Sequence, residues 1–321
     1  MKSVIIGAGT FGTAIANELL SNSSNEVVLY SNNIEKVHEI NKFNTNNKIF
    51  PNKKLHYKIK ATKDVSIFDS ADVIFIALPS SSIKKQIEKI KDSLRLEAII
   101  VNLSKGIFDN GVTIVDYLKK FLNTENVITL KGPSFASEVL EHSTTLLTLG
   151  YKTNEQLQII TNIFKKTCIN LDVTKDIKGV EILSVLKNIY ALLMGIIDAK
   201  YNSPNTRFLF LTKSFNEMRL LLLQLGGKED TLLLGCGFGD LCLTSLNDLS
   251  RNRTLGLFIG KGFFNIENDQ HVVVLEGLNA IRMIKSLSIN MQKELPLLNT
   301  LYNFLNNRNK RVNIDFDNLL H

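Results

Sequence analysis

The strongest structural signal near the start of this chain is the stretch Ser3-Val4-Ile5-Ile6-Gly7-Ala8-Gly9-Thr10-Phe11-Gly12. Residues 3–6 predict a strand, the glycines a turn, and residues 13–20 a helix that leads to a second strand at 26–30. Glycines with this spacing, between a strand and a helix, are typical of a dinucleotide-binding turn. Gly7 would make the tight turn, Gly9 would let the backbone approach a pyrophosphate, and Gly12 would let helix and strand pack closely.

The end of the second predicted strand bears on which dinucleotide would bind. It reads Tyr30-Ser31-Asn32-Asn33, without the acidic residue that usually binds both ribose hydroxyls of NAD and repels a 2′-phosphate. No arginine follows that would clamp the phosphate of NADP, and Lys36 is at most a helper. The sequence therefore admits either NAD or NADP.

Strands and helices alternate through the first half of the chain. Residues 71–79 and 98–103 read as buried parallel strands because they are apolar on both faces. Short helices are expected at 64–69, 82–94 and 154–166, and further strands at 127–130, 144–149 and 168–173. This alternation predicts an α/β fold in which residues 1–178 form a Rossmann-type, doubly wound, dinucleotide-binding domain.

Long helical runs replace this alternation from Gly179 onward. They are expected at 180–198, 208–225, around 240 and 250, and at 275–287 and 295–305. Residues 179–321 are therefore predicted to form a mostly α-helical domain that binds the substrate and carries the catalytic groups.

Lys187-Asn188 interrupts the apolar helix expected at 180–198. On a wheel of about 100° per residue, Ser184, Ala191, Gly195 and Asp198 fall on the same side as this pair. Such a stripe is what a core helix shows when one side faces a small polar ligand. The alternatives are a lysine that snorkels to solvent and a membrane span, which the charges in the helix disfavour.

Composition excludes several other classes of protein. A net charge of +7 permits nucleic-acid binding, but the lysines are spread along the chain rather than gathered in a basic arm. Three cysteines form neither a disulfide framework nor a zinc spacing, and the five histidines show no metal-like pairing. No targeting segment is recognised before the first strand. We therefore expect a cytoplasmic protein without a metal, with no nucleic-acid partner and no membrane insertion.

Polar clusters follow several predicted strands and helices. They are Ser104-Lys105-Gly106, Lys131-Gly132-Pro133-Ser134-Phe135-Ala136, Gly235 to Thr244, and Ser250-Arg251-Asn252-Arg253. Ligands of open parallel sheets gather at the carboxyl ends of the strands, and an arginine with amide and hydroxyl neighbours can grip a phosphate. Together the clusters indicate a small phosphorylated ligand beside the dinucleotide.

In order and spacing these motifs, with Lys187-Asn188 and Glu276-Gly277, resemble the bacterial NAD(P)-dependent glycerol-3-phosphate dehydrogenases over nearly the whole chain. The resemblance implies reversible reduction of dihydroxyacetone phosphate to sn-glycerol 3-phosphate, which supplies glycerophospholipid synthesis. It implies Lys187, Asp240 and Lys105 as the catalytic group. It also allows a homodimer.

The resemblance implies two further sets of residues. Substrate contacts would be Lys105, Gly132, Ser134, Lys187, Asn188, Asp240, Thr244, Ser250, Arg251 and Asn252. Cofactor contacts would be Gly7, Gly9, Thr10, Phe11, Gly12, Asn32, Lys105, Ala136, Arg251, Val274 and Glu276. The Lys187 stripe would then face a cleft in which Asp240 and Lys105 lie near the ammonium.

One segment departs from the family pattern. Residues 200–208 read Lys-Tyr-Asn-Ser-Pro-Asn-Thr-Arg-Phe, where the family usually has a glycine- and alanine-rich segment. Asn205 and Arg207 of the family pattern are retained there, but the bulkier neighbours would reshape the entrance to the substrate site or lower activity. Two alternatives stay open. One is a related two-domain reductase of hydroxy or keto acids, and the other is a dinucleotide-binding protein that has lost catalysis.

Overall fold

A computed structural model describes residues 1–263, 272–291, 293–306 and 319, without the side chains of 272–278, 289 and 306. The chain divides into two compact units. Unit 1 comprises Met1–Lys105 and Ile114–Ile177, and unit 2 comprises Gly106–Thr113 and the chain from Lys178 onward. The short segment Gly106–Thr113 thus groups with unit 2, although it precedes the boundary expected between residues 178 and 179.

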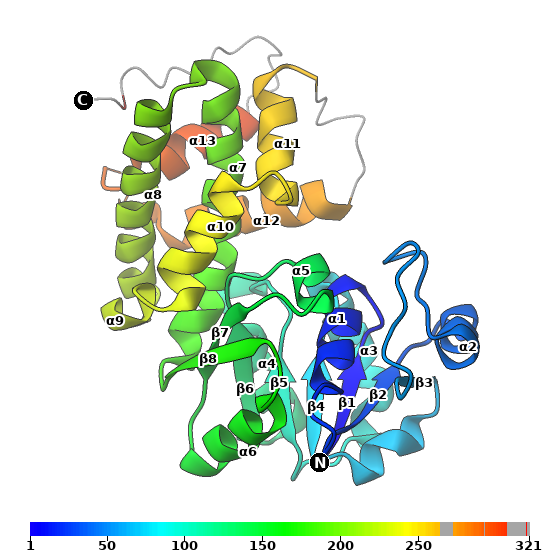
Figure 1. Cartoon of the computed structure of the whole chain (residues 1–321). Coiled ribbons are helices and arrows are strands. Elements are labelled where there is room, and N and C mark those ends of the chain that lie inside the picture. The colour runs from blue at the N-terminus through cyan, green and yellow to red at the C-terminus, as the bar shows by residue number, and fades with distance from the viewer. Residues whose placement is uncertain (264–271, 292, 307–318, 320–321) are drawn as a thin grey trace. The chain divides into compact units, whose positions relative to one another are not determined.

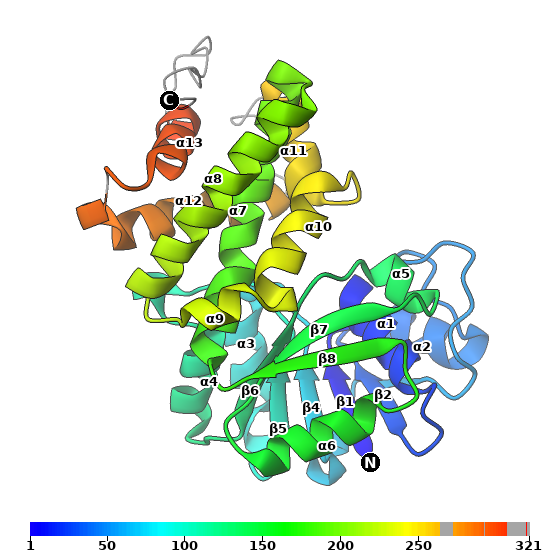
Figure 2. The same cartoon turned by 60° about the vertical axis from the view of Figure 1, so that its left-hand side comes forward.

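Unit 1 is built on an eight-stranded sheet in the order β3-β2-β1-β4-β5-β6-β7-β8, seen in Figures 1 and 2. The strands are β1 (Lys2–Ile6), β2 (Glu26–Tyr30), β3 (Lys60–Thr62), β4 (Val73–Ile76), β5 (Ile99–Asn102), β6 (Val127–Lys131), β7 (Thr145–Gly150) and β8 (Ile169–Thr174). All neighbouring pairs are parallel except β6 and β7, which are antiparallel. Strand order reverses beside β1, so the doubly wound sheet is confirmed.

The helices of unit 1 are α1 (Thr10–Leu19), α2 (Ile34–Phe43), α3 (Ser80–Ile90), α4 (Ile114–Leu122), α5 (Ala136–Leu140) and α6 (Asn154–Phe164), with a 3-10 helix at Val65–Ser70. Thr153 caps α6 in a complete capping box with Gln156. Helices α2, α4 and α5 and strand β3 were not among the expected elements. In α4, Ile114, Leu118 and Leu122 are buried at helical spacing, a periodicity that could have identified it.

Unit 2 is helical, as predicted. It contains α7 (Ile177–Tyr201), α8 (Pro204–Gln224), α9 (Glu229–Leu232), α10 (Asp240–Leu246), α11 (Arg251–Gly260), α12 (Val272–Leu287) and α13 (Pro296–Asn306). Helix α8 starts four residues before the expected position, because Ser203 caps it and Pro204 occupies its first turn.

Helix α7 forms the centre of unit 2. It is long and apolar enough to cross a membrane, with a mean hydropathy of 1.8 over its 18-residue window, yet 94% of that window is buried inside the structure. Its leucines and isoleucines pack against apolar side chains of α8, α12 and α13 in one core cluster. The burial is that of a core helix.

Helices α7 and α11 pack with their backbones in contact. A Cβ added to Gly195 of α7 would lie 2.1 Å from the carbonyl oxygen of Arg253, and one added to Gly256 of α11 would lie 2.1 Å from that of Leu192. No side chain larger than hydrogen fits at either position. The glycines therefore hold α11 against the stripe of small and polar residues on α7.

Candidate active site

The glycine turn of unit 1 has the geometry that the sequence predicts. Gly7 has φ +113°, and a Cβ there would lie 2.5 Å from the oxygen of Ala77. A Cβ on Gly12 would lie 2.1 Å from the oxygen of Gly7, whereas one on Gly9 would meet nothing within 4 Å. Gly9 also precedes the first turn of α1 without a side-chain cap, so open space lies beside backbone N–H groups that can bind a pyrophosphate.

Two side chains from the region after β2 hold the carbonyl oxygen of Ala8 in this turn. Lys36 Nζ donates to it at 2.9 Å and Asn46 Nδ2 at 3.2 Å. Asn46 is fully buried and also donates to Thr13 Oγ1 at 3.0 Å, so it ties the turn to α1. Burial and the nearby Lys48 lower the pKa of Lys36. Asn46 was not predicted, and no local sequence pattern distinguishes it from the neighbouring asparagines.

Asn32 lies exposed beyond the end of β2. Its amide donates to Gln86 Oε1 at 2.6 Å, and its side-chain oxygen accepts from the hydroxyl of Tyr30 at 3.2 Å. These neutral partners neither repel nor clamp a 2′-phosphate. The geometry thus leaves both NAD and NADP admissible.

Phe11 and Ala136 lie in the same apolar cluster of unit 1, where α1 packs against α5. The turn before α5 requires glycine, because Gly132 has φ +153° and a Cβ there would lie 2.8 Å from the oxygen of Leu146. Ser134 donates to the carbonyl of Gly132 at 3.2 Å. The structure therefore brings the predicted Gly132–Ala136 segment next to the helix that carries the glycine turn.

Ser104, directly before Lys105, is fixed by hydrogen bonds at the carboxyl ends of three strands. Its hydroxyl donates to Ile76 O at 3.2 Å and accepts from Leu78 N at 3.0 Å. From β6, the buried ammonium of Lys131 donates to Asn102 O at 2.9 Å and to Ser104 O at 2.6 Å. The sequence indicates Lys131 only as part of a motif. Its contacts show that it holds the backbone from which Lys105 emerges.

In unit 2, Lys187 is 3% exposed, so it does not snorkel to solvent. Its ammonium donates to Asp240 Oδ1 and, at 2.9 Å, to Thr244 Oγ1. Thr244 Oγ1 in turn donates to Asp240 Oδ1 at 3.2 Å. Asn188, next along α7, is half-buried and donates to Ser184 O at 3.2 Å. The predicted contact between Lys187 and Asp240 is confirmed.

The glycine-rich segment before Asp240 forms one turn of π-helix at Gly235–Gly239. A Cβ on Gly237 would lie 2.1 Å from Leu232 O, so the close approach of backbone to backbone requires glycine there. This turn leads directly into α10, whose first residue is Asp240 and whose fifth is Thr244. One turn of helix therefore presents both partners to Lys187.

Ser250, Arg251 and Asn252, which we call the phosphate turn, begin α11. Ser250 is buried and caps the helix by accepting from Arg253 N at 3.3 Å. Arg251 is exposed and Asn252 partly buried. A helix start with an exposed guanidinium and an amide beside it suits an anionic phosphate.

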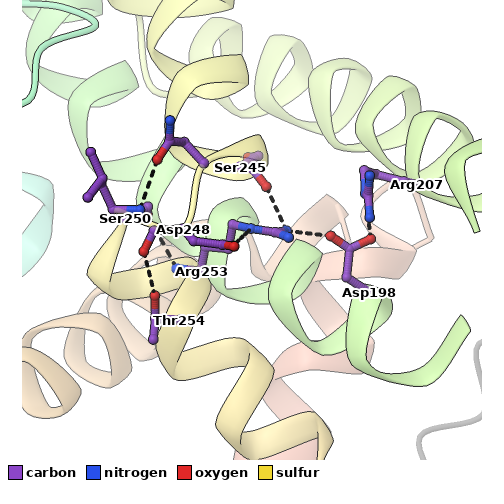
Figure 3. A network of polar contacts seen from close by, with 9 residues as sticks. Asp198, Arg207, Ser245, Asp248, Ser250, Arg253 and Thr254 are labelled. Carbon is purple, nitrogen blue, oxygen red and sulfur yellow. Dashed lines mark hydrogen bonds and ion pairs between the residues drawn. The ribbon is translucent and has the colours of Figure 1, made fainter. Parts of the chain in front are cut away.

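Arg253, directly after the phosphate turn, is buried and lies at the centre of the network of polar contacts in Figure 3. Its Nη1 pairs with Asp198 Oδ2 of α7 and donates to Ser245 O of α10 at 3.0 Å, while its Nε donates to Asp248 Oδ1 at 2.9 Å. The other oxygen of Asp198 accepts from Arg207 Nε at 2.7 Å. The sequence places Arg253 in a motif and assigns it no role. The position of Asp198 on the Lys187 stripe was the signal that could have revealed it.

Two features of the predicted site are not tested by the structure. Val274 and Glu276 lie in α12, but their side chains lie outside the described residues. Lys105 belongs to unit 1 and Lys187 to unit 2, so their expected proximity, and the cleft between them, stay predictions.

A mostly parallel sheet with an open glycine turn, and a helical unit with a buried lysine, aspartate and threonine, define the class of two-part dinucleotide-dependent oxidoreductases. The family models of the NAD-dependent glycerol-3-phosphate dehydrogenase N-terminus and C-terminus match residues 2–157 and 176–314. The chain belongs to this family.

Relatives match over almost their full length. A glycerol-3-phosphate dehydrogenase [NAD(P)+] of Methanothermobacter thermautotrophicus is 36% identical over 94% of this chain and 92% of its own. One of Clostridium botulinum is 32% identical over 95% and 92%. Because the first relative is archaeal, the narrower bacterial assignment is not shown.

Solved structures share the fold of this chain. A glycerol-3-phosphate dehydrogenase of Coxiella burnetii has a TM-score of 0.84 at 28% identity and covers 95% of this chain and 94% of its own. A ketopantoate reductase of Ralstonia eutropha has a TM-score of 0.60 at 15% identity, with 95% and 97% covered, which shows a shared fold alone.

Proposed function

We propose that this chain reversibly reduces dihydroxyacetone phosphate to sn-glycerol 3-phosphate with NADH or NADPH. The observation that carries the proposal is the buried ammonium of Lys187, held by Asp240 and Thr244 in a member of this family. We further propose that the product serves glycerophospholipid synthesis. Three free thiols support a reducing, cytoplasmic location, and a homodimer is part of the same proposal.

The nicotinamide ring of the bound cofactor supplies the hydride. Lys187 supplies the proton to the oxygen on C2 of the substrate, and its positive charge stabilises that oxygen as negative charge develops on it. Asp240 and Thr244 orient the ammonium. Lys105, on the backbone held by Lys131, binds a substrate oxygen together with Gly132, Ser134 and Asn188.

The phosphate group of the substrate is bound by Ser250, Arg251 and Asn252. Charge-assisted hydrogen bonds to it would contribute about 1.5 to 3 kcal/mol each. The cofactor is bound by the residues from Gly7 to Gly12 and by Asn32, Lys105 and Ala136, with Arg251, Val274 and Glu276 contributing from unit 2. Lys36 and Asn46 support the turn by holding the oxygen of Ala8.

The direct test follows the absorbance of NADH and NADPH with dihydroxyacetone phosphate, for the natural sequence and for Lys187→Ala. We expect turnover by the former and a loss of about 10²- to 10⁴-fold in the variant, as for removal of a general acid. Lys178→Ala, an exposed lysine at the start of the same helix, is the matched control and should retain full activity.

Other outcomes point elsewhere. Turnover of hydroxy or keto acids without a phosphate, in place of dihydroxyacetone phosphate, would identify a related two-domain reductase. Binding of NADH without oxidation of any substrate would identify a dinucleotide-binding protein that has lost catalysis. Either result contradicts the proposal.

A further inference from the structure

We infer that Arg253 is a positioning residue that fixes the phosphate turn relative to Lys187 and Asp240 and so sets the selectivity for a phosphorylated substrate. This inference rests on the proposed function, because it concerns how that substrate is held. Arg253 does not itself bind the phosphate.

The Nη1 and Nε groups of the Arg253 guanidinium are held by protein acceptors. Arg253 is 7% exposed and bonds to Asp198, Asp248 and the carbonyl of Ser245. Asp198 and Ser250 lie on opposite sides of it in Figure 3. Two carboxylates, of Asp198 and Asp248, face two guanidiniums, of Arg253 and Arg207, so the network adds no net charge to attract an anion. The exposed guanidinium next to it in the chain, that of Arg251, is the one that can reach a ligand.

The contacts of Arg253 join every segment that carries a proposed substrate group in unit 2. Asp198 lies on α7, which carries Lys187, and Ser245 lies on α10, next to Thr244. Asp248 lies in the connection from α10 to α11, and its carbonyl also accepts from Thr254 Oγ1 at 3.0 Å. One planar side chain with a fixed fork of donors therefore sets α7, α10 and the start of α11 in one arrangement.

The glycine contact alone does not fix this arrangement. Gly195 and Gly256 set how closely α7 and α11 approach, but neither has a side chain to stop one helix from sliding along the other. The ion pair between Arg253 and Asp198 prevents this sliding. It lies at the N-terminal end of α11, where the phosphate turn is. A shift of about 1 Å there would move Arg251 and Asn252 away from the phosphate and weaken their hydrogen bonds to it.

Arg207 extends the network into the segment that departs from the family pattern. It binds the second oxygen of Asp198 from the first turn of α8 and is less buried than Arg253. The bulky residues around Arg207 are thus tied to the same carboxylate that orients the phosphate turn. This explains how the altered segment can coexist with an ordered site.

The test uses the full chain with Arg253→Lys and Asp198→Asn, and with Arg219→Lys as the matched control. Arg219 of α8 pairs with Glu229 of α9 and is not one of the proposed site residues, so its variant makes the same arginine-to-lysine change outside the proposed site. A lysine cannot span three acceptors, and an asparagine keeps the shape of Asp198 without its charge. Thermal unfolding and circular dichroism select the variants that fold, and either of the two carries the test.

The assays measure kcat and KM for dihydroxyacetone phosphate, kcat/KM for dihydroxyacetone, the Kd of inorganic phosphate by calorimetry, and the Kd of NADH. We expect KM for the phosphorylated substrate and the Kd of phosphate to rise together by about tenfold or more. The kcat for dihydroxyacetone phosphate, the kcat/KM for dihydroxyacetone and every quantity of the Arg219→Lys variant should stay within about twofold of the natural sequence, the spread of small surface effects. The Kd of NADH should rise less than that of phosphate, because Arg251 is only one of the proposed cofactor contacts.

Two results would overturn the inference. One is an equal loss of kcat/KM for both substrates, which would show general damage or an effect on Lys187. The other is an unchanged Kd of phosphate in folded variants. Failure of the natural sequence to turn over dihydroxyacetone phosphate at all would instead contradict the proposed function, so the two failures are distinguishable.

Discussion

Lys187 is buried, and its ammonium group makes hydrogen bonds to protein groups in place of water. Desolvating an ammonium costs several kcal/mol, and only well-placed partners offset that cost. Asp240 compensates its charge, while Thr244 bonds to both and fixes the direction in which the ammonium points. The buried Lys187–Asp240 ion pair is therefore weak evidence for a contribution to stability and stronger evidence for a reactive lysine in a fixed orientation.

The hydroxyl of Thr244 should affect the rate more than the fold. Thr244→Val removes the 2.9 Å bond to Lys187 at nearly constant volume, and Thr244→Ser restores the hydroxyl. We expect kcat to fall about tenfold in the valine variant, as for one lost hydrogen bond to a charged group, and to recover in the serine variant. Steady-state assays decide this, and equal activity in all three proteins would mean that Thr244 does not orient the lysine.

Glu217 of α8 is a buried carboxylate that is not one of the proposed site residues. Burial raises its pKa to about 7, although Leu297 N, Leu298 N and the hydroxyl of Tyr190 donate to it and act in the opposite direction. The folded state thus binds this proton more tightly than the unfolded state. The resulting stabilisation is complete below the unfolded pKa near 4.5 and is lost as the pH rises through about 7.

Glu217→Gln removes this titration. Relative to the variant, the natural sequence should lose about 3 kcal/mol of unfolding free energy between pH 4.5 and pH 8, because each pKa unit corresponds to about 1.36 kcal/mol. Urea unfolding across that range measures the difference. Parallel pH curves for the two proteins would show that Glu217 keeps its ordinary pKa.

At the scale of elements, α7 and α11 depend on two glycines that let their backbones touch. Gly256→Ala would place a methyl group 2.1 Å from Leu192 O, so the helices must separate. We expect the unfolding free energy to fall by about 1–3 kcal/mol, as for overpacked cores. Phe258→Ala, on the exposed side of α11, should change it by less than about 0.5 kcal/mol. Urea unfolding of both variants tests this, and similar losses in the two would contradict it.

Elements that depend on local patterns could be predicted from the sequence. Strand β2 falls where it was expected, and the glycine turn has the predicted contacts, because period and turn chemistry act over a few residues. The contact between Lys187 and Asp240 could be predicted only from the resemblance of the combined motifs to a known family. Lys131 with Ser104, and Asp198 with Arg253, join residues 27 and 55 positions apart, and no local period encodes such pairs.

At the scale of the whole molecule, cofactor binding should appear as added stability. A ligand at 100 times its Kd stabilises the folded state by about 2.7 kcal/mol, provided that it binds that state alone. In Gly9→Val the side chain would enter open space at a φ of −84°, which any residue adopts, so the cofactor-free fold should keep its stability. The same side chain would occupy the place of the pyrophosphate, so the gain from NADH should vanish.

Thermal unfolding with and without NADH measures both halves of this prediction. Hydrogen exchange of the β1–α1 peptides assigns the shift to unit 1, since a chain of two compact units can unfold in more than one step. A Gly9→Val protein that retains the NADH shift would place the cofactor elsewhere.

The contact of Gly195 with Gly256 also limits how this sequence can evolve. In each case the obstacle to a side chain is the backbone of the opposite helix, which no second substitution can make smaller. A cavity opened by one mutation is often filled by another, but here no compensating change exists. We therefore expect both positions to remain glycine while exposed positions of α11, such as Phe258, vary.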